Sequence, residues 1–274
     1  MKKIAIGVFL GVFLAATVYG GKLSLKFNGG GMYLLGGDFN KSCDGLRDYE
    51  KSILGSTEKF VDNLKKLGMG FQFDAEVLYE LNPSLAVGVE IGYLTASVQS
   101  GFERPAVSFK QTLTPTLSAV PITLNAHYFL PFGPKMMLDI VAGAGVFLSH
   151  LNYEYAIEST NYPYSGTWKP ESKIAFGAKA GVGLEYSLSN NIALAVDIGA
   201  RFAEITGFTG PWSGTYAGTD KSGTGTLYYY NYDGKYPLVG IYETLSSGGH
   251  YQEVREAKFS LSGLSALIGI RVKL

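Results

Sequence analysis

The end of the chain, Ser262–Leu274, alternates between apolar side chains and polar or small ones. An alternation with a period of two predicts a β-strand with one apolar face. Seven earlier segments repeat the pattern, and little in the sequence could form a second layer over so many apolar faces. A sheet closed on itself, apolar outside and polar inside, solves this problem in a membrane. In the last strand the apolar face holds Leu264, Ala266, Ile268, Ile270, Val272 and Leu274.

The eight predicted strands are each long enough to cross a bilayer at a tilt, which needs roughly 9–11 residues. Three connections are tight turns, at Asn82–Ser84, Pro131–Lys135 and Ser189–Asn191, and they alternate with four long ones. This alternation is typical of short periplasmic turns and long external loops. We therefore predict an all-β, eight-stranded, antiparallel, up-and-down transmembrane β-barrel with both termini in the periplasm. The predicted strands are residues 22–35, 69–81, 85–98, 116–130, 136–150, 172–188, 192–206 and 257–274.

The first residues resemble an export signal. Two lysines precede an apolar run, Ile4–Val18, and small residues follow it near Gly20. The run is shorter than the roughly 20 residues that a membrane-spanning helix needs. We expect residues 1–20 to be a cleaved signal peptide and residues 21–274 to form a single barrel domain.

Composition excludes several classes of function. The 23 basic residues balance the 23 acidic ones, so charge gives no reason to expect nucleic acid as a partner. The single cysteine, Cys43, cannot form an internal disulfide. We find no metal-ligand spacing, no phosphate-binding glycine loop and no nucleophile–base pattern. The sequence therefore predicts no cofactor, no metal and no enzymatic activity.

Several strand segments resemble the small outer-membrane barrel superfamily that includes the OmpA transmembrane domain and the OmpW family. The resemblance implies a multi-pass protein of the bacterial cell outer membrane, with membrane lipids and the barrel-assembly machinery as partners. It also implies that the final strand is an assembly signal, through Leu264, Ile268, Ile270, Val272 and Leu274, where Leu274 replaces the usual Phe. The segments are residues 81–93, 120–131, 142–148 and 180–197.

Charged side chains at inward positions predict an ionic network that closes the lumen. If the tight turns set the register, Glu76 lies opposite Glu90 and Lys179 opposite Arg201. Like charges on neighbouring strands repel, and buried charges are tolerated only when paired. We expect the acidic pair to be balanced by the basic pair across the lumen, although an ion path or acid–base site stays an alternative. The predicted network consists of Asp74, Glu76, Glu90, Lys179, Asp197 and Arg201.

Two long loops carry further patterns. Apolar residues at helical spacing predict helices at 46–54 and at 56–68, the second starting at Ser56 and ending at Gly68. These helices could form a lid or simply pack on their own loop. The segment 227–242 predicts a hairpin that turns at Asp233–Gly234. Aromatic residues in these loops are candidates for an external binding surface, namely Trp168, Trp212, Tyr228, Tyr230, Tyr232 and Tyr236.

These expectations favour a structural or interaction role through the external loops, with a lumen largely closed by charged side chains. The alternative, which the resemblance to the OmpW family implies, is a narrow channel for uptake of small apolar compounds. A lipid-modifying enzyme of the outer membrane is a third hypothesis, and it requires a Ser or Asp within reach of a His at the outer rim. The sequence does not identify the external ligand.

Overall fold

Eight antiparallel strands form a closed ring in the computed structural model, which describes residues 22–54, 59–160, 163–171 and 173–274. The ring closes because the last strand pairs with both the preceding strand and the first. The expected signal peptide, residues 1–20, lies outside the described residues. The ring strands are β1 (Lys22–Leu34), β3 (Met69–Asn82), β4 (Leu85–Ser97), β6 (Phe109–Pro131), β7 (Met136–Ser159), β9 (Lys173–Ser187), β10 (Ile192–Thr206) and β16 (Gly263–Lys273).

The ring strands agree closely with the eight predicted segments, apart from two extensions and one break. β6 begins at Phe109 instead of residue 116, and β7 ends at Ser159 instead of residue 150. The predicted strand 257–274 is divided into β15 (Lys258–Ser260) and β16 by a break at residues 261–262, where Leu261 is fully buried. All three predicted tight turns join neighbouring ring strands.

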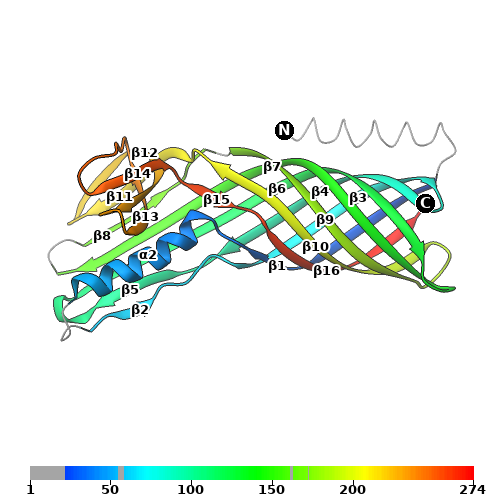
Figure 1. Ribbon diagram of the computed structural model, residues 1–274, viewed down its shortest axis with the longest axis horizontal. Coiled ribbons are helices and arrows are strands. Elements are labelled where there is room, and N and C mark those ends of the chain that lie inside the picture. Colours follow the sequence, from blue (N-terminus) through cyan, green and yellow to red (C-terminus); the bar gives the residue numbers. More distant parts are fainter. Residues whose placement is uncertain (1–21, 55–58, 161–162, 172) are drawn as a thin grey trace.

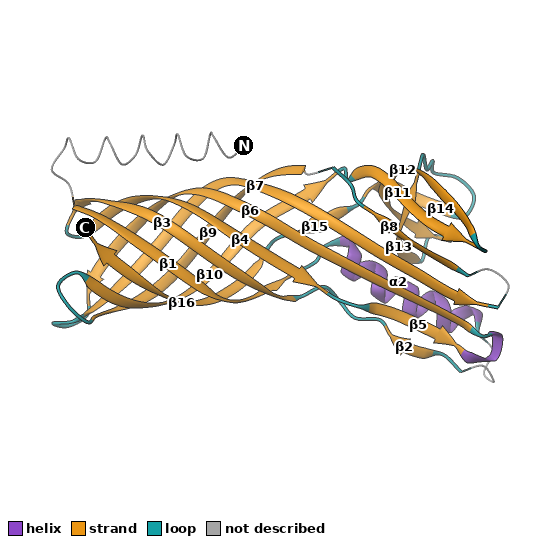
Figure 2. Cartoon of the chain, turned by 180° about the vertical axis from the view of Figure 1, so that it is seen from behind, coloured by secondary structure: helices purple, strands orange, loops and turns teal. Residues whose placement is uncertain are grey.

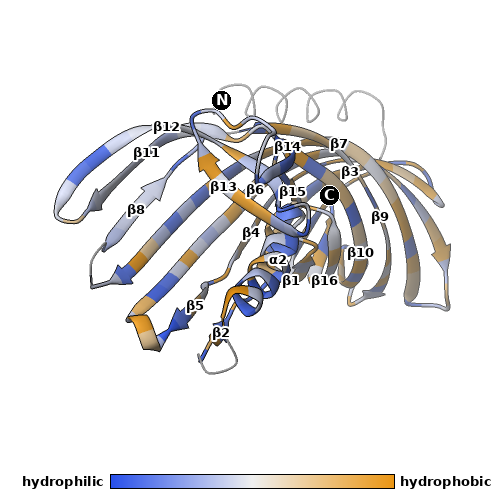
Figure 3. Cartoon of the chain, turned by 60° about the vertical axis from the view of Figure 1, so that its left-hand side comes forward, coloured by the Kyte–Doolittle hydropathy of each residue, from blue (hydrophilic) through white to orange (hydrophobic). Residues whose placement is uncertain are grey.

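The two faces of the ring differ sharply in chemistry. Outward side chains are large and apolar, and Phe176 is 82% exposed. Inward side chains are mostly charged, amide or small. Figure 3 shows hydrophilic and hydrophobic residues alternating along the strands. Neighbouring residues of a pleated strand point to opposite faces, so the alternating sequence places apolar side chains outside and polar ones inside. This is the reverse of an ordinary protein, whose interior is apolar.

A second region, which we call the distal region, continues the sheet beyond one end of the ring (Figure 1). The extended β6 and β7 would leave unpaired backbone groups there, and short strands pair with them instead. The long connections are therefore largely strands, of which the sequence analysis predicted only the hairpin at 227–242. They are β2 (Val61–Asn63), β5 (Ser100–Arg104), β8 (Tyr164–Trp168), β11 (Thr209–Tyr216), β12 (Thr219–Tyr232), β13 (Tyr236–Tyr242) and β14 (Tyr251–Glu256), with a 3₁₀ turn, η1 (Pro105–Val107).

Helix α2 (Asp38–Ile53) lies against the curled sheet of the distal region (Figure 2). It contacts β13 on one side, where Ser42 Oγ accepts a hydrogen bond from the Val239 N–H at 3.1 Å. On the other side Glu50 pairs with Arg104 of β5. The helix thus bridges two separate parts of the sheet. Among the described residues, no helix is long and apolar enough to cross a membrane.

One predicted helix in the first long connection is present and one is wrong. Residues 46–53 of the predicted segment 46–54 are helical and form the second half of α2, which already begins at Asp38. In the segment 56–68, by contrast, residues 61–63 form β2 and pair with β5, and Ser56 lies outside the described residues. The apolar spacing that suggested a helix serves packing, because Leu64 and Leu67 are buried while the backbone between them is irregular.

The predicted hairpin in the last long connection is confirmed. β12 and β13 pair from Tyr232–Tyr236 to Thr226–Tyr242. Asp233 and Gly234 both have positive φ, 51° and 65°, as a tight hairpin turn requires. The Lys235 N–H closes the turn on the Tyr232 carbonyl oxygen at 3.1 Å.

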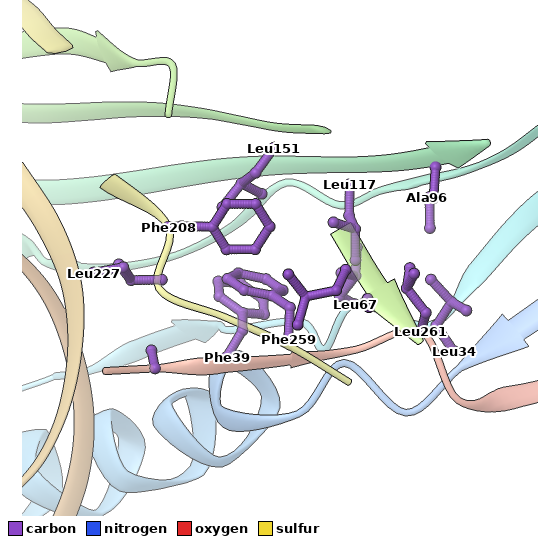
Figure 4. Packing of buried hydrophobic residues seen from close by; sticks show 14 of the residues in the cluster. Leu34, Phe39, Leu67, Ala96, Leu117, Leu151, Phe208, Leu227, Phe259 and Leu261 are labelled. Atoms are coloured by element: carbon purple, nitrogen blue, oxygen red, sulfur yellow. The ribbon is translucent and has the colours of Figure 1, made fainter. Parts of the chain in front are cut away.

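The apolar core lies at the junction between the ring and the distal region (Figure 4). Side chains from the ends of the ring strands meet residues of α2 and the long connections there. Phe39 packs parallel to Phe259, with 6.3 Å between ring centroids, and Phe208 meets Phe259 edge-on. We call this cluster the distal core, and its fully buried members include Leu34, Leu67, Leu117, Phe147, Leu151, Trp168, Phe208, Phe259 and Leu261.

Candidate functional site

Charged side chains fill the interior of the ring, and Lys26 of β1 stands at their centre. Its ammonium lies 3.1 Å from Asp139 Oδ2 and 3.0 Å from Asp197 Oδ1, with Glu185 Oε1 at 3.7 Å. We call the set the lumen network. It comprises Lys26, Asp74, Glu76, Glu80, Glu90, His127, Asp139, Lys179, Glu185, Asp197, Arg201 and Arg271.

His127 links two parts of the lumen network. Its Nδ1 lies 2.9 Å from Asp139 Oδ1 and its Nε2 lies 3.0 Å from Glu76 Oε1. The carboxylate of Asp139 therefore contacts both His127 and Lys26. Glu76 also accepts a hydrogen bond of 2.6 Å from the Asn125 amide. The contacts form one continuous chain across the lumen.

Arg271 of β16 anchors the end of the ring near the tight turns. Its guanidinium donates to Glu185 Oε2 at 3.1 Å, to Glu80 Oε1 at 2.8 Å and to Ser24 Oγ at 2.9 Å. It also lies over the ring of Phe129, 4.5 Å from its centroid. These partners satisfy a fully buried cation with charge and hydrogen bonds together.

The predicted register is present, but the predicted partners are only partly right. Glu76 pairs with Glu90 across β3 and β4, and Lys179 pairs with Arg201 across β9 and β10. Lys179 contacts Glu90 through the lumen. Arg201, however, makes no ion pair among the described residues, because its guanidinium is used by Gln72 Oε1 at 2.9 Å and the Leu261 carbonyl at 3.0 Å.

Two other predicted members have different partners from those expected. Asp197 reaches Lys26 instead of Lys179 or Arg201. Asp74 accepts a hydrogen bond from the Gln72 amide at 2.6 Å. Strand alternation places Lys26, His127, Asp139 and Arg271 on the inner face as well, but they were not among the six predicted members of the network. Lys26 and Arg271 lie on β1 and β16, whose mutual register no tight turn fixes. His127 and Asp139 lie on β6 and β7, and the register set by the Pro131–Lys135 turn could have brought them together.

The lumen network leaves little free space. The gap among its side chains is a cavity of about 60 Å³, far smaller than a ligand pocket. The distal core lies directly beyond it, where Phe147 of β7 is fully buried. Charged and apolar barriers therefore follow one another along the ring axis. No group of three or more His, Cys, Asp or Glu side chains among the described residues is arranged to hold a metal ion.

A much larger cavity, about 560 Å³, lies in the distal region between α2 and the surrounding strands. We call it the distal cavity. Most of its lining is aliphatic or aromatic. The residues that line it include Leu46, Leu113, Tyr153, Tyr155, Tyr164, Trp212, Tyr230, Leu238, Val239, Ile241, Tyr242 and Glu243.

The aromatic residues predicted as an external surface are divided between buried and exposed positions. Trp168 is 0% exposed and belongs to the distal core, where its indole N–H donates to the Gly210 and Gly225 carbonyls, so its placement on a surface is wrong. Tyr230 is also buried, and Trp212 lines the distal cavity. Tyr228, Tyr232 and Tyr236 are half-buried. Tyr232 and Tyr236 pack edge-on against Tyr49 of α2, with centroids 5.3 and 5.5 Å apart.

An ion pair between the buried Asp38 carboxylate and the partly exposed Arg255 fastens the start of α2. Arg255 donates to both carboxylate oxygens of Asp38, at 2.6 and 3.0 Å, and the Lys258 N–H donates at 2.8 Å. Burial would raise the pKa of Asp38, but these hydrogen bonds and the Arg255 charge outweigh it and lower the pKa below its usual value of 3.8. One turn later burial raises the pKa of the Cys43 thiol to about 11.

The residues predicted as an assembly signal lie along the outer face of β16 and at the end of the chain. Leu264, Ile268, Ile270 and Leu274 are exposed and Val272 is half-buried.

A closed antiparallel ring with an apolar exterior and a charged interior defines a β-barrel of the outer-membrane class. The chain belongs to the outer membrane protein beta-barrel domain family, whose model matches residues 8–207.

Several solved structures are similar to the chain at low identity. A major outer membrane protein from Thermus thermophilus is 14% identical, with a TM-score of 0.43, covering 93% of this chain and all of that one. OprG from Pseudomonas aeruginosa is 11% identical, with a TM-score of 0.39, over 92% of this chain and 95% of that one. The outer membrane protease OmpT from Escherichia coli is 9% identical, with a TM-score of 0.34, over 93% and 96%. No curated protein matches the sequence.

Proposed function

We propose that the ring spans the bacterial outer membrane as an eight-stranded up-and-down barrel, with the distal region outside the cell. The apolar exterior supports contact with membrane lipid along the ring. The C-terminus and the three tight turns lie at the end away from α2, as Figure 1 shows for the C-terminus. In the proposed orientation both termini are periplasmic and the long connections face outward.

The protein's work, in our proposal, is structural or interaction-based and is carried out by the distal region. The observation that carries this proposal is that two barriers, the lumen network and the distal core, lie one behind the other along the ring axis. The lumen network leaves about 60 Å³, and the packed distal core lies beyond it. A solute would have to break several buried ion pairs and displace the core, both of which are costly.

Conductance across planar bilayers tests the closed lumen. We expect refolded wild-type protein to show no stable ion-conducting steps. A double variant, Glu90→Gln with Lys179→Met, removes one ion pair without adding charge and should allow intermittent conduction. Lys110→Met with Glu158→Gln is the matched control, because this exposed pair lies on the outer parts of β6 and β7. Stable conductance of the wild-type protein would refute the proposal.

A narrow channel for small apolar compounds is the second candidate. The distal cavity favours it, because its apolar lining suits such a solute. The distal core separates that cavity from the lumen, so passage would require movement of fully buried residues such as Phe147 and Leu117. The test measures uptake of a radiolabelled alkane into vesicles that contain the protein and into vesicles that do not. Faster uptake with the protein supports the channel, and equal uptake supports the closed lumen.

We propose further that the protein is not an enzyme. One Asp–His contact does occur at the far end of the distal region, where His250 Nδ1 meets Asp233 Oδ1. The His250 side chain is 67% exposed, and its ring stacks on Tyr232. Water screens such an exposed pair, so it is a poor environment for activating a nucleophile. Hydrolysis of peptides or phospholipids by the wild-type protein, lost in His250→Gln, would overturn this proposal.

The proposed partners are outer-membrane lipids and the barrel-assembly machinery. The apolar outer face of β16, which ends at Leu274, supports the role of this strand as an assembly signal. Replacing Leu274 by Asp should slow membrane insertion in cells, whereas the same change at Leu188, in a tight turn, should not. Equal insertion rates would contradict the assembly role.

A further inference from the structure

We propose that the distal cavity binds a small amphiphile with a flat or elongated apolar body and a positively charged end beside Glu243. The inference rests on the proposed function only in taking the distal region as the working part of the protein. It concerns a binding site that ends inside the distal region and does not serve as a route through the barrel.

The size and lining of the distal cavity suit a small molecule. Its volume, about 560 Å³, lies within the roughly 300–1,000 Å³ that is usual for ligand pockets. Leu46 of α2, Leu113 of β6 and Val239 of β13 supply aliphatic surface. Trp212 and Tyr242 supply aromatic rings. An apolar body would gain dispersion contacts on several sides there.

The walls hold the cavity open because each is fixed by other contacts. Ser42 of α2 accepts a hydrogen bond from the Val239 N–H, which ties the helix to β13. Gly45 allows the helix to approach Pro237 so closely that a Cβ would overlap the Pro237 carbonyl. The sheet itself cannot collapse inward without breaking its hydrogen-bond ladder. An apolar space that cannot close favours a ligand that fills it.

The polar end of the ligand is assigned from charge. Glu243 is the one charged residue among the described residues that line the cavity, and it is exposed. No described side chain forms a hydrogen bond or ion pair with it. An ammonium beside this carboxylate would also lie near the aromatic part of the lining, which attracts cations through the ring faces. An anionic end would meet repulsion from Glu243 instead.

Cys43 provides a built-in reporter of occupancy. It is the single cysteine of the chain, it lines the distal cavity and it is 3% exposed. A ligand in the cavity should therefore slow the alkylation of Cys43 by bromobimane. The test uses the full protein in nanodiscs and three biphenyl compounds that differ only in an ammonium, hydroxyl or carboxylate end.

We expect the ammonium compound to protect Cys43 at about tenfold lower concentration than the alcohol, from a partly screened ion pair with a cation–π contribution. The carboxylate should protect least. Glu243→Gln should remove the difference between ammonium and alcohol, and this exposed substitution should not disturb folding. Leu46→Lys places a charge in the apolar wall and should abolish protection by all three, whereas Ile53→Lys on the exposed part of α2 should not.

Failure of each part is recognisable. Absence of protection by any compound overturns the site, and equal protection by all three overturns the role of Glu243. Protection that persists in Leu46→Lys also overturns the site. Bilayer conductance is independent of these results, because a conducting protein that binds the ammonium compound refutes only the closed lumen.

Discussion

Lys26 forms ion pairs with more carboxylates than any other described cation inside the ring. Its ammonium faces three carboxylates, and one of them, Asp139, also contacts His127. Removing one partner from a buried ionic group leaves the remaining charges uncompensated in a region that water hardly enters. The loss of stability on substitution therefore depends on the uncompensated charges that remain as much as on the contact that is lost.

Lys26→Met should destabilise the barrel by about 3–5 kcal/mol, the range for breaking a buried ion pair. The measurement is urea unfolding in lipid vesicles, followed by intrinsic fluorescence. Lys135→Met, in an exposed turn, is the control and should leave the midpoint unchanged. Adding Asp197→Asn to Lys26→Met should restore part of the loss, because it removes one of the stranded carboxylates. Equal midpoints for Lys26→Met and the control would contradict the central role.

Asp38 should make the packing of α2 sensitive to acid. Because its pKa in the folded protein is lowered below 3.8, its contribution to stability is fully present above that pH and disappears as the pH falls through the folded pKa. Near-UV circular dichroism between pH 2 and pH 6 follows the aromatic packing. Asp38→Asn should remove this part of the acid transition, and Asp48→Asn, on the exposed side of α2, should not.

The comparison with Asp38→Asn is needed because the pKa of a second acidic residue of the same helix, Glu50, is shifted in the opposite direction. Burial raises the pKa of Glu50 more than its contacts with Arg104 lower it. Glu50 therefore favours the fold less as the pH rises through its pKa. Only the difference between the acid transitions of the wild-type protein and of Asp38→Asn reports the contribution of Asp38. Identical acid curves for these two proteins would refute the assignment.

Helix α2 depends on close approach to β13. A methyl group on Gly45 would overlap both the carbonyl oxygen and the ring of Pro237. Alanine is the better helix former by about 1 kcal/mol, so helix propensity and packing predict opposite effects of Gly45→Ala. The substitution therefore separates the stability of the helix itself from its attachment to the sheet.

We expect Gly45→Ala to push α2 away from β13 and to raise the alkylation rate of Cys43 several-fold. The rate is measured with bromobimane on folded protein, and Asp48→Ala on the same helix serves as the control. A rate that is unchanged or lower in Gly45→Ala would show that propensity outweighs the packing conflict.

Element by element, the ring was predictable from sequence and the distal region largely was not. Ring strands such as β10 show clean alternation because one face is the apolar exterior of the ring and the other lines its charged lumen, so their bounds could be predicted. β8 and β11 lack this contrast, since their side chains face protein or water irregularly. In the lumen, parity identified Lys179 and Glu90, whereas Arg201 found an amide and a carbonyl that only tertiary structure reveals.

At the scale of the whole molecule, the exterior of the ring should respond to charge as a lipid-facing surface does. Val196→Arg on the outer face of β10 should cost about 2–4 kcal/mol if it lies near the bilayer midplane. Val107→Arg, equally exposed but in the distal region, should cost little. Unfolding of both variants in lipid vesicles makes the comparison. Similar small effects at the two sites would contradict a membrane around the ring.

β6 and β7 remain paired without a break from Pro131–Met137 to Phe109–Ser159. At about 3.3 Å per residue, the 24 residues of β7 span roughly 80 Å, so the same two strands run from the tight turns to the far tip. The far end of the distal region is therefore held in a fixed position relative to the ring by two continuous, paired strands, instead of being joined to it by a flexible linker. A force applied to the far ends of β6 and β7 would therefore be transmitted along the two paired strands into the ring, and shortening either strand there would leave its partner unpaired.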